Sequence, residues 1–157
     1  SGTEARRVAD LDAFERTWAR GDYWALVVLP PDRLPATADE HTTLAAAAAL
    51  ERVKQDAAAA EAYRAILSRW PKSFAAQLGL GNALYAGGEH DDAEQAYRAA
   101  IRLRPDDPIP WNNLAYVLAA LGRPTEARAA AEEAVRLAPD DATAYRDTLR
   151  ELSGEGQ

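Results

Sequence analysis

The sequence predicts an all-α protein built from stacked helix pairs, and three observations lead to this prediction. Alanine-rich stretches with helical periodicity fill most of the chain. Helix-breaking prolines and helix-capping Asp or Ser residues divide these stretches at regular intervals. The third observation is a constant spacing, of about 34 residues, that recurs in five columns and indicates a repeat architecture. The columns are Leu50, Leu84 and Leu118; Ala59, Ala93 and Ala127; Tyr63, Tyr97 and Ala131; Pro71, Pro105 and Pro139; and Asp39, Ser73, Asp107 and Asp141.

These columns resemble the tetratricopeptide repeat, whose unit is a pair of antiparallel helices stacked into a superhelix. Residues 74–107 match the pattern closely, residues 108–141 also match, and residues 40–73 are the weakest copy. Residues 142–152 repeat the start of the unit and resemble the capping helix that often closes such arrays. The resemblance implies three repeats and a capping helix in a domain over residues 37–154.

The residue types at these columns have physical roles in such a stack. Small residues in the alanine column let two helix backbones approach closely, where a larger side chain would overpack the contact. Tyr63 and Tyr97 are the large side chains expected to fill the space between one pair and the next. The Asp and Ser column is expected to cap the first helix of each unit.

A turn should separate the two helices of each unit. In the second unit a Gly-Gly pair ends the first helix, and Asp91 with Glu94 has capping-box spacing with Asp91 as the cap. In the third unit residues 121–124 (LGRP) form the turn, with proline in the first turn of the next helix. The first unit lacks glycine here, so an aberrant turn or an over-long first helix is expected, and Asp56 is the candidate cap.

Residues 1–36 differ from the repeats and are predicted to form a short helix, one strand and a proline-rich linker. Leu11, Phe14 and Trp18 have helical spacing, and residues 23–29 (YWALVVL) have the composition of a buried strand. Residues 10–31 resemble the carboxyl end of a papain-like cysteine peptidase domain of the bacteriocin-processing type, on the segments FERTW and YWALVVLPP.

The peptidase resemblance implies that the chain is the C-terminal part of a larger bacterial protein. That family's catalytic residues precede this strand, and the chain has no cysteine, so the chemistry would lie in an upstream domain. The resemblance implies a cell-envelope or periplasmic location; without it, we expect a cytoplasmic one. Two other interpretations remain open: the segment packs on the first repeat as a cap, or its strand pairs with a second copy in a homodimer.

Composition excludes several classes of partner. Lys and Arg number 18 against 25 Asp and Glu, which gives a formal charge of −7 and a pI near 4.9. No segment is strongly basic, so nucleic acid and anionic membrane surfaces are not expected partners. No apolar run approaches the roughly 20 residues of a membrane span.

No catalytic constellation, metal site or cofactor motif is expected in this chain. The acids of EHDDAE are typical of a helix start, and His41 and His90 are expected at the surface. The sequence therefore predicts a protein-interaction module that binds a peptide or protein partner and is not itself an enzyme. The alternative is a scaffold that self-associates through the N-terminal strand or the capping helix.

In the tetratricopeptide family the first helices of the repeats line a concave groove, which the resemblance makes the binding site. Asparagines and tyrosines there suit an extended peptide or a short helix. Chaperone-binding members hold a terminal carboxylate with two asparagines and three basic residues. Asn82 and Asn113 match the asparagines, but Leu78, Thr143 and Asp147 replace the basic residues, which disfavours a chaperone tail. The predicted groove residues are Leu78, Asn82, Tyr85, Asn112, Asn113, Tyr116, Arg146 and Arg150.

Overall fold

The computed structural model describes Leu34, residues 38–138 and residues 142–152. Within these residues the chain forms seven α-helices and no strand, so the predicted all-α fold is confirmed there. The helices are α2 (Glu40–Arg52), α3 (Asp56–Arg69), α4 (Phe74–Ala86), α5 (His90–Leu103), α6 (Pro108–Ala120), α7 (Pro124–Leu137) and α8 (Thr143–Leu152).

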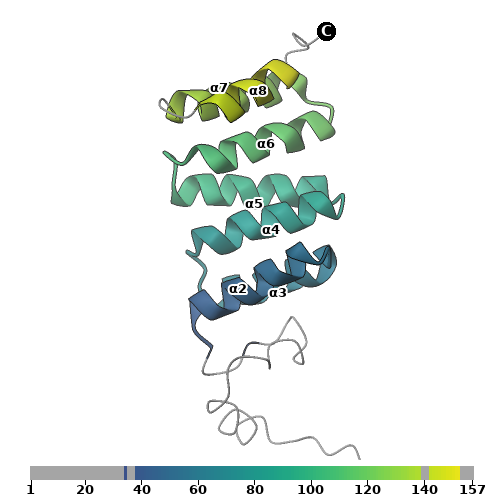
Figure 1. Ribbon diagram of the computed structural model, residues 1–157, viewed down its shortest axis with the longest axis vertical. Coiled ribbons are helices and arrows are strands. Elements are labelled where there is room, and N and C mark those ends of the chain that lie inside the picture. The colour runs from purple at the N-terminus through teal and green to yellow at the C-terminus, as the bar shows by residue number, and fades with distance from the viewer. Residues whose placement is uncertain (1–33, 35–37, 139–141, 153–157) are drawn as a thin grey trace, which may run out of the picture.

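Consecutive helices form pairs that stack along one axis. Figure 1 shows α2, α4 and α6 stacked in front of α3, α5 and α7. Each helix contacts the next one in the chain, and further contacts join α2 to α4, α4 to α6, and α6 to α8. Helix α8 packs on α7 and α6 and ends the stack, as predicted for a capping helix. We call the side made by α2, α4, α6 and α8 the first-helix face.

The first helix of each pair begins at its predicted cap. The carboxylate of Asp39 accepts a hydrogen bond from the Thr42 amide at 2.9 Å. The Ser73 hydroxyl accepts from the Ala76 amide at 3.2 Å, and Asp107 accepts from Ile109 at 3.0 Å. These side chains satisfy amides at helix starts that have no partner within the helix.

Two of the second helices, α3 and α5, begin earlier than the sequence predicts. Helix α5 starts at His90 with Glu89 as its N-cap, so Asp91 is not the cap but lies in the first turn. Helix α3 starts at Asp56 itself, with Gln55 as N-cap, and neither N-cap residue makes a side-chain capping bond. The carboxylates of the first turn still interact favourably with the helix dipole. Pro124 occupies the first position of α7, as expected.

The turn of the first pair is regular, and the predicted over-long helix is wrong. Lys54, Gly88 and Gly122 occupy the same position in successive repeats, and all have positive φ angles, of 57°, 81° and 73°. The same backbone bonds close the turns: the Gln55 amide donates to Leu50 and the Glu89 amide to Leu84, both at 2.9 Å. The first pair therefore has the same turn as the other two, with a lysine in the left-handed conformation where they have glycine.

The core consists mainly of alanine contacts and two tyrosines. Ala59, Ala93 and Ala127 are fully buried, so the close approach expected at this column is confirmed. Tyr63 and Tyr97 are also buried, at 4% and 2% exposure. Leu84 and Leu118 are buried as well, whereas Leu50 is only half-buried. This core holds the first-helix face in a fixed arrangement.

Several predictions concern residues outside the described ranges. They are the short helix around Leu11 to Trp18, the strand over residues 23–29, and Pro139 with Asp141 at the last repeat boundary. The peptidase resemblance of residues 10–31 also lies there. The division between an extension over residues 1–36 and the repeat domain therefore stays a prediction.

Candidate functional site

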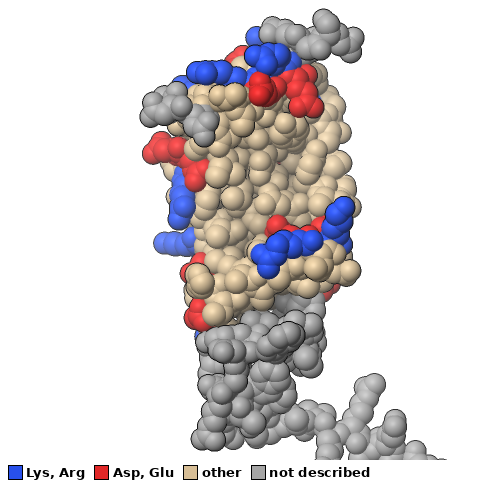
Figure 2. All heavy atoms as spheres, viewed as in Figure 1, with Lys and Arg blue, Asp and Glu red and all other residues tan. Residues whose placement is uncertain are grey.

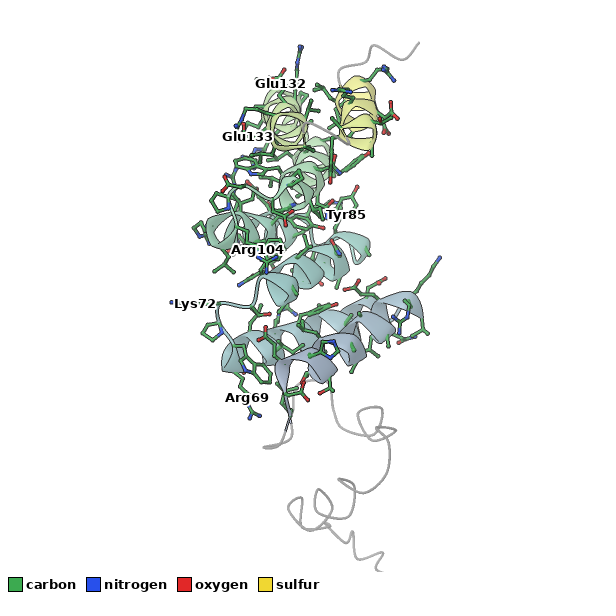
Figure 3. The ribbon with its side chains drawn as sticks, turned by 60° about the vertical axis from the view of Figure 1, so that its left-hand side comes forward. Arg69, Lys72, Tyr85, Arg104, Glu132 and Glu133 are labelled. Carbon is green, nitrogen blue, oxygen red and sulfur yellow. The ribbon has the colours of Figure 1, made fainter. Side chains whose placement is uncertain are left out.

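The two central helices of the first-helix face carry no charged side chain. Neither Phe74–Ala86 nor Pro108–Ala120 contains Asp, Glu, Lys or Arg, whereas α5 and α7 contain several of each sign. Figure 2 shows a broad area of this face without charged groups, with charges gathered at its edges. In Figure 3, Tyr85 lies on the opposite side of the array from Glu132 and Glu133 of α7. The two sides of the stack therefore differ in charge.

Asn82 joins α4 to both α5 and α6. Its Oδ1 accepts one hydrogen bond from the Tyr97 hydroxyl at 2.8 Å and another from Asn113 Nδ2 at 3.1 Å. Burial raises the pKa of the Tyr97 hydroxyl, which keeps it a neutral donor. Because both donors reach the same oxygen, the orientation of the two amides is determined. The Nδ2 group of Asn82 and the Oδ1 atom of Asn113 remain available for further hydrogen bonds.

Tyr85 on α4 and Ile109 on α6 are exposed large apolar residues, at 38% and 43%. The Tyr85 ring packs against His90, with 5.3 Å between the ring centroids. This contact leaves His90 half-buried, so its predicted surface position is only partly correct. Leu78 and Asn112 are half-buried, and Oδ1 of Asn112 is enclosed without a hydrogen-bond partner.

Tyr116 anchors the capping helix. Its hydroxyl lies 3.1 Å from Oγ1 of Thr148 and 3.4 Å from Oε2 of Glu151. The predicted groove residue thus uses its polar end within the fold, while its half-buried ring remains on the face. Arg146 and Arg150 are exposed on α8, and Arg150 forms an ion pair with Asp147 at 2.8 Å.

Two further residues shape this region, Gly79 and Glu51, and the repeat columns place both of them on the groove side of first helices. A Cβ atom added at Gly79 would lie 2.6 Å from both Cε1 and Oη of Tyr63, closer than real contacts allow. Glu51 of α2 is half-buried, and its Oε1 is enclosed without a hydrogen-bond partner. Burial raises the pKa of Glu51, the Tyr63 hydroxyl lowers it, and nearby Asp56 raises it further. The repeat spacing was a signal for Glu51, because it stands one repeat before Tyr85.

A shallow hollow of about 650 Å³ lies at one edge of the face, where α5 ends and α6 begins. Exposed Ile109 and half-buried Tyr145 bring apolar surface to it from α6 and α8. The full lining is Leu103, Arg104, Pro105, Asp106, Asp107, Pro108, Ile109 and Tyr145.

Neither a metal cluster nor a membrane span is found in the described part of the chain. Among these residues, no group of three or more His, Cys, Asp or Glu side chains is placed to hold a metal ion. No helix in the described ranges is both long and apolar enough to cross a membrane.

Comparison with protein families agrees with the observed helix pairs. A family model described as "TPR repeat" matches residues 81–122, and one described as "Tetratricopeptide repeat" matches residues 108–141. Residues 81–141 therefore carry tetratricopeptide repeat sequence. The repeats at residues 74–107 and 108–141 contain these matches, and the pair formed by α2 and α3 extends the same array. No curated protein sequence matches the chain.

Several solved structures share this fold. The Sgt2 TPR domain from Aspergillus fumigatus superposes with a TM-score of 0.71 at 18% identity, covering 76% of this chain and 80% of that one. The chaperone SycD of Yersinia enterocolitica gives 0.70 at 17% identity, covering 78% and 99%. The first TPR of Spaghetti gives 0.69 at 16% identity, covering 74% and 91%. At these identities the likeness concerns the fold alone.

Proposed function

We propose that the first-helix face binds a largely uncharged segment of a protein partner and catalyses no reaction. The observation that carries this proposal is the absence of charged residues from α4 and α6, beside an exposed tyrosine and an exposed isoleucine. Aromatic and aliphatic side chains of this kind are typical anchors at the centre of an interface. The predicted groove residues are the proposed contacts.

The amides of this face suit the main chain of a bound peptide. Asn82 Oδ1 already accepts from the Tyr97 hydroxyl and from Asn113 Nδ2. The Nδ2 group of Asn82 can therefore donate to a ligand, and the Oδ1 atom of Asn113 can accept from one. A peptide residue carries the complementary pair, one carbonyl and one N–H group. Main-chain hydrogen bonds would provide affinity, and contacts with Tyr85 and Ile109 would select apolar side chains.

Two of the similar structures contain peptides, which supports a peptide ligand here. SycD is in complex with a peptide of the translocator YopD, and Spaghetti is bound to the HSP90 peptide SRMEEVD. The second of these peptides is acidic. In this chain Leu78, Thr143 and Asp147 occupy the positions that correspond to the basic clamp residues of chaperone-binding repeats. We therefore propose a partner segment recognised along its length and not by a terminal carboxylate.

A peptide selection tests this proposal although the partner is unidentified. The whole chain is used to select binders from a displayed library of random peptides, and the bound peptide is mapped by amide NMR shifts. We expect the largest shifts on α4 and α6, and about a tenfold loss of affinity for Tyr85→Ala and Asn112→Ala, since interface anchors contribute on the order of 1–2 kcal/mol.

The matched control is Gln95→Ala, because Gln95 is an exposed amide on α5. This variant should bind the selected peptides as the unmodified chain does. Shifts confined to α3, α5 and α7, or a failure to select any peptide, would refute the proposal.

Self-association through residues 1–36 stays a prediction. Light scattering coupled to size-exclusion chromatography, with and without these residues, measures it. A dimer that becomes a monomer on their removal is the expected result of strand pairing, and an unchanged mass contradicts it.

A further inference from the structure

Glu51 places a carboxylate at the α2 end of the surface that α4 and α6 leave uncharged. It stands at the same repeat position as Tyr85, which is exposed on the first-helix face. Its carboxylate lies beside the Tyr63 hydroxyl, and the Tyr63 ring packs against Gly79 of α4. Glu51 therefore borders the surface on which α4 presents its side chains.

The carboxylate of Glu51 forms no ion pair within the described part of the chain. None of the ion pairs formed there includes Glu51. The groups around it are Tyr63 and Asp56 of α3 and Tyr97 of α5, while α4 contributes no charged side chain. An enclosed carboxylate oxygen without a donor is unfavourable, because it has lost the hydrogen bonds that water would make.

We propose that Glu51 selects a ligand with a cationic N–H donor, a Lys or Arg side chain or a free amino terminus, next to its uncharged segment. This inference rests on the proposed function and adds a specificity residue to the same face. A charged donor bound at the carboxylate balances its charge, and such hydrogen bonds are about twice as strong as neutral ones. Because Glu51 is half-buried, the interaction is also screened less than one at the surface.

Binding of such a ligand should depend on pH. Burial raises the pKa of Glu51 above its usual value, so Glu51 takes up a proton at a higher pH than an exposed glutamate does. Only the ionised carboxylate attracts the cation. The affinity for a cationic peptide should therefore be highest well above this pKa and fall as the pH falls through it.

The test compares two selections from one library of random peptides, with the unmodified chain and with Glu51→Gln. Glutamine has nearly the same shape but no charge, and circular dichroism checks that the variant is folded. We expect the unmodified chain to select peptides with a recurrent Lys or Arg, and Glu51→Gln to lose this residue while keeping the apolar part. A Glu61→Gln selection is the control, because Glu61 is an exposed glutamate on α3.

Affinities of the selected peptide then measure the interaction directly. Replacing its basic residue by norleucine should weaken binding to the unmodified chain by about tenfold and leave binding to Glu51→Gln unchanged. Acetylation removes the charge of the peptide amino terminus. A loss of affinity on acetylation would show that Glu51 binds the amino terminus and not a side chain. The unmodified chain should lose affinity on acidification, whereas Glu51→Gln should not.

The outcomes separate this inference from the proposed function. The inference is overturned if the selected peptides map to α4 and α6 but carry no recurrent basic residue. It is also overturned if Glu51→Gln selects the same basic residue as the unmodified chain. Both outcomes leave the proposed function standing. If no peptide maps to this face, both are overturned.

Discussion

The junction between the first two helix pairs and the junction between the second and third place equivalent tyrosines in different surroundings. Tyr63 meets Gly79, which has no side chain to obstruct its ring. Tyr97 stands at the same position one repeat later, and its hydroxyl donates to Asn82, which also holds Asn113. The first junction thus depends on shape, and the second on shape together with a polar network.

This difference shows how one repeat position serves two purposes. Gly79 and Asn113 stand one repeat apart and face equivalent tyrosines. Where the position is glycine, the ring fills the space and the contact is closed. Where it is asparagine, the amide bridges to α4 and reaches the first-helix face. The second junction therefore contributes amide groups to the proposed binding site.

The largest expected effect is the loss of the second tyrosine. Tyr97→Ala should lower the free energy of unfolding by about 3–5 kcal/mol, because it removes a fully buried ring. It also removes a donor from Asn82, worth about 0.5–1.5 kcal/mol, and Tyr63→Ala, which removes the hydroxyl beside the Glu51 carboxylate, should cost a similar amount. Chemical denaturation followed by circular dichroism measures both. Tyr97→Phe, which keeps the ring, is the control, and a loss as large as that of Tyr97→Ala would contradict the packing role.

An intermediate effect is expected at the glycine of the first junction. Gly79→Ala should destabilise by about 1–3 kcal/mol, because its Cβ collides with the Tyr63 ring. In the Tyr63→Ala background the same substitution should be neutral or stabilising, since alanine favours a helix over glycine by about 1 kcal/mol. Equal costs of Gly79→Ala in the two backgrounds would show that the ring does not require glycine there.

The smallest expected effect is at the turns, where the first pair differs from the others. Lys54→Gly should stabilise the protein by about 1 kcal/mol, because a lysine in the left-handed conformation is strained. Gly88→Ala should destabilise by a similar amount for the same reason. Thermal and chemical unfolding measure whether each substitution raises or lowers the stability. A destabilising Lys54→Gly would mean that the lysine side chain contributes more than its backbone costs.

Sequence reasoning was reliable where the interaction is local. Asp39, Ser73 and Asp107 cap their helices because a cap needs only an oxygen near the next amides. It failed at Asp91, where the spacing to Glu94 suggested a capping box. In the structure Glu94 pairs with Arg98 and with Arg123 of the next repeat, at 2.8 and 2.7 Å. A partner 29 residues away, which sequence spacing does not reveal, engages that carboxylate.

The site was predicted as a set of positions but not as a set of contacts. The columns of the repeat placed Asn82, Asn113 and Tyr116 on first helices, and the structure has them there. Which of their atoms form hydrogen bonds depends on the distance between helices. In the structure Asn82 is hydrogen-bonded to Tyr97 and Asn113, and Tyr116 to Thr148 of the capping helix.

The sequence by itself determined the period, the helix type, the buried alanine column and the uncharged character of α4 and α6. These properties follow from the order of residues along single helices, because periodicity and capping act within a few residues. Only the tertiary structure decided that Gly79 must make room for Tyr63, that Lys54 replaces a turn glycine, and that an oxygen of Glu51 lacks a partner. Each of these features depends on how closely neighbouring helices approach one another. That approach is determined by the packing of the whole array and not by the local sequence.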